Sequence, residues 1–380
     1  MASPAPPRES VLVVNAGSSS LKVKAYPSGR RLVVERIGEG GRATHDAALE
    51  ESLARLGGED GFGPPLVVGH RVVHGGTAYT QPTVVDDDVE AGIAALCDLA
   101  PLHNPANLAA LRAARRLLPD AVHVAVFDTA FHATLPRRAY LYGLPLSYAE
   151  RGLRRYGFHG TSHDFVTREA ARLLGRERDQ LRLVSLHLGN GASGAAVDRG
   201  VVVDTSMGFT PLEGLLMGTR SGDVDPGLVL HLLREGVPSD EIDALLNRRS
   251  GLAGMSGVSN DMRDVRAAAA AGSDAAAAAL EVYAYRVRKL VGAYAAAMGG
   301  LDAVVFTGGV GQNDAATRAA ALEGLGFLGV RLDEAANAAG GPVISEPGSP
   351  VAVLVVHTDE EVLIAAQAVE AARRAGGRAS

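Results

Sequence analysis

Cysteine and lysine are both scarce in this sequence. Cys97 is the one cysteine among 380 residues, so the chain has no disulfide framework, which suits a reducing cytoplasm. Only three of the 37 basic residues are lysines, at positions 22, 24 and 289, and none of them follows a glycine. The Walker A phosphate-binding loop, which needs a Gly-Lys pair, is therefore excluded.

The chain also lacks a long uninterrupted apolar run and an excess of positive charge. The longest apolar tract, 267–298, is mostly alanine and is interrupted by five charged side chains, so it predicts a soluble helix or helical pair and not a membrane span. The first ten residues have no charged segment followed by an apolar one, so we expect no signal peptide. A formal net charge of −6 at pH 7 argues against nucleic acid as a partner, because proteins that bind the phosphate backbone normally have a basic face.

Two similar strand–turn–strand patterns, about half a chain apart, suggest an internal duplication. The apolar run VLVVN ends at the turn AGSSS and is followed by the alternating strand LKVKAY, so 11–26 is predicted to form a β-hairpin. Residues 183–198 repeat this pattern around a Gly/Asn/Ser turn. A chain of 380 residues is also too long for one ordinary hydrophobic core. We therefore expect two related domains.

Strands and helices alternate along the remainder of the chain, which defines an α/β protein. Further strands are predicted at 121–127, 201–206, 303–308 and 350–356. Helices are predicted at 86–97, 105–118, 226–235, 239–247, within 260–298, from about 314, and at 359–374. Thr358 and Asp359 are candidates to cap the last helix. The segment 143–157 has no clear periodicity and is the candidate crossover between the domains.

Glycine-rich turns are the candidate phosphate sites, because backbone N–H groups commonly bind nucleotide phosphates. The turn within 15–22 contains three consecutive serines, a glycine and an asparagine, and the turn at 187–193 has a similar composition. Either turn alone could be an ordinary Ser/Gly hairpin, but two in the same setting are stronger evidence. Residues 308–311 could lie against a base or ribose, or form a plain βα turn. The G-x-G-x-x-G pattern at 324–329 follows a predicted helix and not a strand, so we interpret it as a helix-ending turn.

Three charged residues stand out in these segments. A lone arginine in a loop is usually a solvated charge, but Arg71 and Arg220 both lie in glycine-lined segments. Two such guanidinium groups could clamp an anion, since each binds carboxylate or phosphate through two hydrogen bonds. Asp128 follows the predicted strand 121–127, where it could contact a metal or ligand or could be a helix N-cap.

Histidines and acidic residues complete the set of candidates. His159 and His163 are four residues apart, but glycines flank His159 and no glutamate lies beside it, so we do not expect a zinc pair. His159 is better interpreted as a hydrogen-bond donor to a transferring group. The acidic residues 359–361 could complement the dipole of the last helix. Alternatively they could supply a Mg²⁺ ligand, because Mg²⁺ prefers one or two carboxylates together with phosphate oxygens and water.

Taken in order and spacing, eight motifs resemble the acetate kinase family. They are NAGSSSLK, GHRVVHGG, PLHNPAN, FDTAFH, YGFHGTSH, HLGNGAS, DTSMGFTPLEGLLMGTRSGDVDPG and HTDEE, and the likeness runs from about residue 11 to 370. The resemblance implies the fold of the sugar kinase, actin and heat-shock chaperone ATPase superfamily. That fold has two duplicated actin-like, ribonuclease H-like domains with mixed β-sheets around a nucleotide cleft. The expected N-terminal domain is 1–147 plus 362–380, and the expected C-terminal domain is 148–361.

The resemblance also implies roles for individual residues. The implied catalytic residues are Asp128, Arg71, His159 and Arg220. The implied ATP-binding residues are Asn15, Ser18, Ser20, Lys22, His187, Gly189, Asn190, Gly191, Asp261, Met262, Arg263, Gly309 and Gly311. The implied apolar pocket for the acetate methyl group consists of Val73, Leu102, Phe158 and Pro211, together with Arg71. Asn15 and Glu360 would hold Mg²⁺, with Glu361 as the alternative ligand and Mn²⁺ as the alternative ion.

The activity implied by the resemblance is the reversible transfer of the γ-phosphoryl group of ATP to acetate by a cytoplasmic homodimer. Since a carboxylate is already a nucleophile and needs no general base, we expect direct in-line transfer to give acetyl phosphate and ADP. Two alternatives stay open: a propionate or butyrate kinase of the same fold, and an actin-like or chaperone-like ATPase module. The family more often has glutamate in place of Gln312 and a longer segment around 37–66, so the nucleotide preference also stays open.

Overall fold

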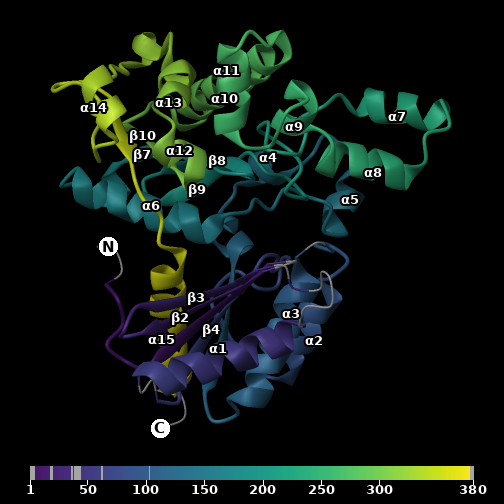
Figure 1. Ribbon diagram of the computed structural model, residues 1–380, viewed down its shortest axis with the longest axis vertical. Helices are drawn as coiled ribbons and strands as arrows, with labels where there is room; N and C mark the ends of the chain where they lie inside the picture. Colours follow the sequence, from purple (N-terminus) through teal and green to yellow (C-terminus); the bar gives the residue numbers. More distant parts are fainter. Residues whose placement is uncertain are drawn as a thin grey trace. The chain divides into compact units, whose positions relative to one another are not determined.

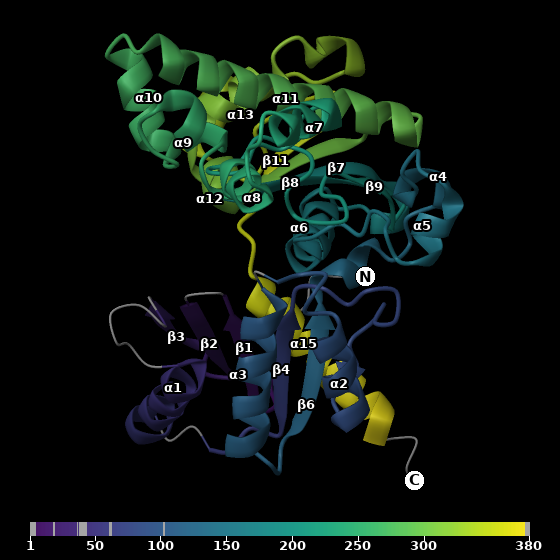
Figure 2. The same cartoon turned by 90° about the vertical axis from the view of Figure 1, so that its right-hand side faces the viewer.

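The computed structural model describes residues 5–17, 20–35, 37, 44–60, 63–101 and 103–376. The chain divides into two compact units (Figures 1 and 2). The C-terminal unit consists of residues 134–358, and the N-terminal unit contains the described residues from 5 to 133 together with those from 359 to 376. The sequence-based boundaries were 147/148 and 361/362. By its contacts, 134–147 groups with the C-terminal unit and 359–361 with the N-terminal unit.

The N-terminal unit is built on a mixed sheet with the order β3-β2-β1-β4-β6-β5. Its strands are β1 (Val11–Ala16), β2 (Ser20–Tyr26), β3 (Arg30–Glu35), β4 (Val67–Val72), β5 (Thr83–Val84) and β6 (Val122–Phe127). Strands β1, β2 and β3 form an antiparallel meander, whereas β4 and β6 run parallel to β1. The predicted hairpin at 11–26 is confirmed, with Val14 opposite Val23.

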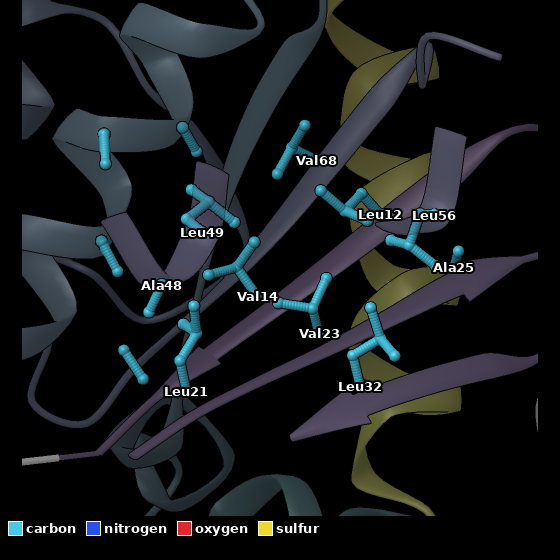
Figure 3. Packing of buried hydrophobic residues seen from close by; sticks show 14 of the residues in the cluster. Leu12, Val14, Leu21, Val23, Ala25, Leu32, Ala48, Leu49, Leu56 and Val68 are labelled. Atoms are coloured by element: carbon cyan, nitrogen blue, oxygen red, sulfur yellow. The ribbon is translucent and has the colours of Figure 1, made fainter. Parts of the chain in front are cut away.

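Helices cover both faces of this sheet. They are α1 (His45–Asp60), α2 (Asp87–Ala95), α3 (Asn104–Leu117), the short 3₁₀ helix η1 (Asp128–His132) and α15 (Glu360–Gly376). Leu12 and Val14 of β1 point into a buried cluster that includes residues of α1 and α3 (Figure 3). The alternate residues Val11 and Val13 belong to a second cluster, with α15. Because successive side chains of a strand point to opposite faces, the continuous apolar run of β1 matches a strand buried on both sides.

The C-terminal unit repeats this topology. Its strands are β7 (Arg182–Leu188), β8 (Ala192–Asp198), β9 (Val201–Thr205), β10 (Ala303–Thr307) and β11 (Ala352–Val355). Their order is β11-β10-β7-β8-β9, with β7, β8 and β9 antiparallel and β10 and β11 parallel to β7. The five strands therefore match β6-β4-β1-β2-β3 in order and direction. The predicted α/β fold with two related mixed sheets is confirmed.

The helices of the C-terminal unit largely follow the predicted pattern. They are α4 (Arg137–Tyr140), α5 (Leu146–Glu150), α6 (Gly160–Leu173), η2 (Arg178–Gln180), α7 (Pro226–Arg234), α8 (Ser239–Arg248), α9 (Gly251–Ser256), α10 (Met262–Ala270), α11 (Asp274–Met298), α12 (Gly308–Asn313), α13 (Ala315–Leu322), η3 (Leu325–Leu328) and α14 (Glu334–Ala339). The alanine-rich tract is a helical pair, as predicted, and Gly324 ends α13 in a left-handed conformation. Residues 308–311, for which a plain βα turn was one of two interpretations, lie in the short helix α12. In the described part of the chain, no helix is both long and apolar enough to span a membrane.

Candidate active site

Arg71 is at the centre of the first group of predicted site residues. From β4 its Nε and Nη2 atoms donate to the two carboxylate oxygens of Asp128, at 3.0 and 2.6 Å. Its Nη1 donates to Oδ1 of Asn15 at 3.2 Å, and a carboxylate oxygen of Glu360 lies 3.9 Å from its Nε. Asn15, Arg71 and Asp128 lie at or just beyond the carboxyl ends of the parallel strands β1, β4 and β6, which meet at one edge of the sheet. The structure thus brings four predicted residues from different motifs together.

The charges of this group are balanced within the N-terminal unit. Burial by itself would lower the pKa of the Arg71 guanidinium, but the carboxylates of Asp128 and Glu360 outweigh this effect and raise that pKa above its usual range. Asp128 is only 1% exposed, and its two oxygens hold Arg71 in a fixed orientation. Asp128, an implied catalytic residue, therefore orients Arg71 in this structure.

The first predicted phosphate turn connects β1 to β2. The N–H group of Gly17 donates to the carbonyl oxygen of Ser20 at 2.7 Å and closes the turn. Lys22 lies opposite Asn15 in the β1–β2 register. Two predicted site residues, Ser18 and Leu102, lie outside the described residues.

Two asparagines without a predicted role hold the loop that follows Arg71. On α3, Asn107 accepts a hydrogen bond from the N–H of Val73 at 3.0 Å and donates to the carbonyl oxygen of Ala16 at 2.6 Å. Asn104 accepts from the N–H of His74 and donates to its carbonyl oxygen, both at 3.0 Å. Both side chains are buried. Their spacing of three residues, which places both on the face of α3 that carries Leu108 and Leu111, was the sequence signal that could have indicated this role.

The second predicted phosphate turn connects β7 to β8. The N–H of Gly189 donates to the carbonyl oxygen of Gly191 at 3.0 Å, and the carbonyl oxygen of Asn190 accepts from Gly218 at 2.9 Å. The side-chain oxygen of Asn190 also accepts from Asn260 at 3.0 Å. A Cβ atom on Gly218 would lie only 2.1 Å from this oxygen, so only glycine allows such a close approach. The turn is therefore held by two other loops of the same unit.

His159 and Arg220 converge on Gly191 of this turn. A Cβ atom placed on Gly191 would lie 3.5 Å from Nε2 of His159 and 3.6 Å from Nη1 of Arg220. Arg220 donates to the carbonyl oxygen of Pro211 at 2.9 Å and contacts the sulfur of Met217 at 3.6 Å. Burial lowers the pKa of Arg220 below its usual value, and no carboxylate of the described residues pairs with it. A half-buried cation with only neutral partners is suited to an incoming anion.

The ring of His159 is fixed by two neighbours. It stacks on His187, with the ring centroids 4.3 Å apart, and its Nδ1 lies 2.8 Å from the hydroxyl oxygen of Ser193. His187 is itself held through Nδ1 by Ser162 at 2.8 Å. His159 adopts a left-handed backbone conformation (φ 56°) immediately before α6, which separates it from His163, a buried residue within the helix.

A cavity of about 660 Å³ adjoins the second turn. The predicted residues that line it are Gly189, Asn190, Asp261, Met262, Arg263 and Gly309. Gly311 does not line it, because a Cβ atom there would lie 3.6 Å from Leu188 and Phe306 in the core of the unit.

Phe158, a predicted residue of the apolar pocket for the acetate methyl group, is buried. Across the described ranges of the chain, no group of three or more His, Cys, Asp or Glu side chains is arranged to hold a metal ion.

Comparisons with known proteins agree with the motifs. The model of the acetokinase family matches residues 43–366. The chain belongs to the acetokinase family. Among similar curated proteins, an acetate kinase of Leifsonia xyli subsp. xyli is 52% identical, with 95% of this chain and 98% of that protein covered. An acetate kinase of Streptomyces coelicolor is 49% identical, with 94% and 95% covered.

Solved structures of the acetokinase family have the same fold. The acetate kinase of Porphyromonas gingivalis has a TM-score of 0.89 and 42% identity, covering 96% of this chain and 100% of that one. A propionate kinase of Francisella tularensis subsp. tularensis has a TM-score of 0.88 and 36% identity, covering 95% and 99%. These matches confirm the resemblance drawn from the motifs.

One departure from the acetokinase pattern can be located in the structure. The side-chain amide of Gln312 donates to the hydroxyl of Thr307 at 3.2 Å, at the end of β10. Gln312 does not line the 660 Å³ cavity.

Proposed function

We propose that this protein transfers the γ-phosphoryl group of ATP to acetate and forms acetyl phosphate and ADP. The observation that carries the proposal is the convergence of Arg220 and His159 on the glycine turn of β7 and β8. A guanidinium with neutral partners and an imidazole beside backbone N–H groups form a site for a phosphoryl group. The family membership and the names of the relatives support acetate as the acceptor.

The C-terminal unit would bind the nucleotide. Adenosine would occupy the cavity lined by Asp261, Met262 and Gly309, because this cavity adjoins the turn at 189–191. The phosphates would then extend along this turn, with His187 beside them. Arg220 and His159 would contact the oxygens of the γ-phosphoryl group and stabilise the charge that these oxygens carry during transfer.

The N-terminal unit would bind the acceptor. Arg71, oriented by Asp128, would bind the acetate carboxylate, with the buried Val73 following it in the chain. Lys22 and Ser20 would assist in binding phosphate oxygens.

The donor set also suits a divalent ion such as Mg²⁺. Asn15 and Glu360 both present hard oxygen ligands beside Arg71, and Mg²⁺ needs only one or two carboxylates in addition to phosphate oxygens and water. Glu361 is a less suitable ligand, because it is buried and lies 3.5 Å from Arg31. A bound Mg²⁺ would neutralise charge on the phosphate oxygens.

The chemical step would be a direct displacement at phosphorus. An oxygen of acetate forms a bond to the γ-phosphorus while the bond from that phosphorus to the β,γ-bridging oxygen breaks, and ADP leaves. The acetate oxygen already carries the electron pair it donates, so no residue has to remove a proton. The protein's contribution is to position the reactants and to counter their negative charges.

We also propose that the enzyme is a cytoplasmic homodimer. No residue of α7 is buried, although this helix carries leucines at 228, 230 and 233 that are 44–51% exposed. A hollow beside it is lined by Leu228 and Tyr285, which is also exposed. Exposed apolar side chains gathered on one helix are typical of protein–protein contacts, and the occupant we propose is a second copy of the chain.

The test of the activity is acyl phosphate formation, trapped with hydroxylamine, from ATP, Mg²⁺ and acetate, propionate or butyrate. We expect rapid product with acetate and none without Mg²⁺ or without acid. One methylene group is worth about 1–3 kcal/mol in an apolar pocket, which corresponds to about 10- to 200-fold, so kcat/KM for propionate should be lower than for acetate by a factor in this range. A higher kcat/KM for propionate than for acetate would instead support a second candidate, a propionate kinase, which is the name of the similar Francisella structure. ATP hydrolysis without product from any acid would contradict the proposal.

A further inference from the structure

A row of buried hydroxyl and imidazole groups leads from the core of the C-terminal unit to His159. The hydroxyl of Ser185 on β7 lies 2.8 Å from Nδ1 of His163 on α6. Nε2 of His163 lies 2.9 Å from the hydroxyl of Ser193 on β8, and this hydroxyl lies 2.8 Å from Nδ1 of His159. Ser185, His163 and Ser193 are fully buried. The roles proposed above assign no function to Ser185 or Ser193. They also do not determine which ring nitrogen of His159 or His163 carries a proton.

The number of protons in this row restricts the form of His159. A serine hydroxyl carries one proton, so Ser193 can donate to only one of its two imidazole neighbours and must accept from any N–H of the other. If His163 donates from Nε2, then Ser193 is free to donate to Nδ1 of His159. In this arrangement Ser185 donates to Nδ1 of His163, so each of the three contacts is a hydrogen bond with one proton.

We propose that Ser193 and His163 are positioning residues that keep neutral His159 protonated at Nε2. Nδ1 of His159 then accepts from Ser193, and the single proton of the ring has to be on Nε2. This inference rests on the proposed function, in which His159 donates a hydrogen bond to the transferring phosphoryl group. Ser193 and His163 act only through His159 and contact neither substrate.

The orientation of the His159 ring explains why its tautomer matters for the proposed function. Nε2 of His159 lies on the side of the ring that faces Gly191 and Arg220. A ring protonated at Nδ1 would present a lone pair to this place and would repel a phosphate oxygen. A ring protonated at Nε2 presents a donor, and the neighbouring guanidinium of Arg220 supplies the positive charge. The ring therefore acts as a neutral donor without gaining a second proton.

The first experiment observes the tautomer directly. In protein labelled with ¹⁵N-histidine, two-bond ¹H–¹⁵N correlation spectra distinguish a ring protonated at Nε2 from one protonated at Nδ1. The signal of His159 is identified as the one lost in His159→Gln. We expect the Nε2–H form in the wild type above pH 7.5, and a mixture of both tautomers in Ser193→Ala. An Nδ1–H form in the wild type, or an unchanged spectrum in Ser193→Ala, would overturn the proposal.

The second experiment separates positioning from general packing. Ser193→Ala should lower kcat by tens of fold, less than the roughly 10²–10³ that loss of a charge-stabilising donor costs, with the KM for ATP changed less than threefold. In the His159→Gln background the same substitution should have almost no further effect, because its target is gone. An equal loss in both backgrounds would show that Ser193 does not act through His159.

Ser206→Ala is the matched control. Ser206 is also buried beside β8, and its hydroxyl accepts from the N–H of Gly194 at 2.9 Å, but no histidine contacts it in the described structure. We expect its kcat to stay within threefold of wild type, and a loss equal to that of Ser193→Ala would count against the proposal. If His159→Gln itself keeps wild-type kcat, the proposed role of His159 fails, whereas the tautomer is still decided by the spectra.

Discussion

At the scale of single residues, the two site arginines keep their charge by different means. Arg71 is balanced by Asp128 through two hydrogen bonds. Removing either partner leaves the other as a buried, uncompensated charge, which typically destabilises a protein by about 3–5 kcal/mol. Arg220 has only a carbonyl oxygen and a sulfur atom as partners. Substitution of Arg220 should therefore affect catalysis more than folding.

We expect Arg220→Ala to lower kcat by about 10²–10³-fold, because one charge-stabilising donor is lost from the transition state. Its melting temperature should stay close to that of the wild type. Arg71→Ala should show a comparable loss of kcat together with a lower melting temperature. Steady-state kinetics and thermal unfolding measure both effects. Activity of Arg220→Ala within threefold of the wild type would remove Arg220 from the mechanism.

Three of the buried histidines of the N-terminal unit, His70, His74 and His123, are not among the candidate site residues. Nε2 of His70 lies 3.0 Å from Nδ1 of His123, and Nε2 of His123 lies 3.0 Å from the carbonyl oxygen of Leu118. Burial lowers the pKa of His70 well below its usual value, with further lowering by His123 and Arg115. Burial also lowers the pKa of His123, and that of His74 to about 4. All three are therefore neutral in the folded protein at pH 7.

The stability should fall as the pH drops below about 6.5, where histidines of the unfolded chain take up protons that the folded state rejects. For His74 alone the loss by pH 4 is about 3 kcal/mol, at about 1.4 kcal/mol per pKa unit. His74→Asn retains an acceptor for the N–H of Gly76, which His74 binds through Nδ1, but it does not titrate. Urea unfolding between pH 7 and 4 should show a smaller decrease for this variant. If the free energy of unfolding decreased equally with falling pH in both proteins, the low pKa assigned to His74 would be wrong.

The candidate site was predictable as a set of residues but not as a set of contacts. Asn15, Arg71 and Asp128 stand out because each lies in a Gly-rich or polar segment at a strand end. That Asp128 orients Arg71, and that Asn107 ties Val73 to Ala16, depends on distances between segments far apart in the chain. Sequence periodicity contains no such information, because it reports only which face of its own element a residue occupies.

At the scale of elements, the connection from β10 to α12 shows how glycine shapes the 660 Å³ cavity. Gly308 has a left-handed backbone (φ 78°), and a Cβ atom there would lie 2.6 Å from the carbonyl oxygen of Leu188. A Cβ atom at Gly309 would have no neighbour within 4 Å, and Gly309 lines the cavity. The first glycine is thus required by the fold and the second leaves room for a ligand.

Alanine substitutions at these two positions should therefore have different effects. Gly308→Ala should destabilise the protein, because the backbone conformation and the contact with Leu188 are both unfavourable for a side chain. Gly309→Ala should fold normally, because the added methyl group would meet no atom within 4 Å. It should raise the KM for ATP several-fold if ATP occupies the cavity that Gly309 lines. Thermal unfolding and ATP titration check the pair. An unchanged KM for ATP in Gly309→Ala would indicate that the nucleotide does not bind beside α12.

Strongly periodic elements were predicted well and glycine-rich ones were not. The two hairpins and the pair α10–α11 follow from alternation and from alanine content. Helix α12 begins with Gly-Gly, and α6 begins with Gly-Thr-Ser after the left-handed His159, so low local helix propensity conceals both. Their helical state comes from packing within the unit, which overrides local preference.

At the scale of the whole molecule, the two units share one topology but present different chemistry at corresponding strand ends. The end of β1 carries Asn15, whereas the end of β7 carries His187 and the glycines of the second turn. The end of β4 carries Arg71, whereas β10 ends in the glycines of α12. The strand ends of the N-terminal unit thus carry the polar side chains Asn15 and Arg71, whereas those of the C-terminal unit are rich in glycine. In the C-terminal unit, Arg220 and His159 reach the turn from other segments.

The proposed homodimer is a property of the whole molecule and follows from the leucines of α7. Leu230→Asp places a charge on this apolar surface, and burying an unpaired charge is strongly unfavourable, so the variant should be monomeric at concentrations where the wild type is dimeric. Light scattering coupled to size-exclusion chromatography measures the mass. Phe327→Asp is the control, because Phe327 is 79% exposed on η3 and lies outside α7. A dimer that persists in Leu230→Asp but dissociates in Phe327→Asp would place the contact elsewhere, and a monomeric wild type would exclude the dimer.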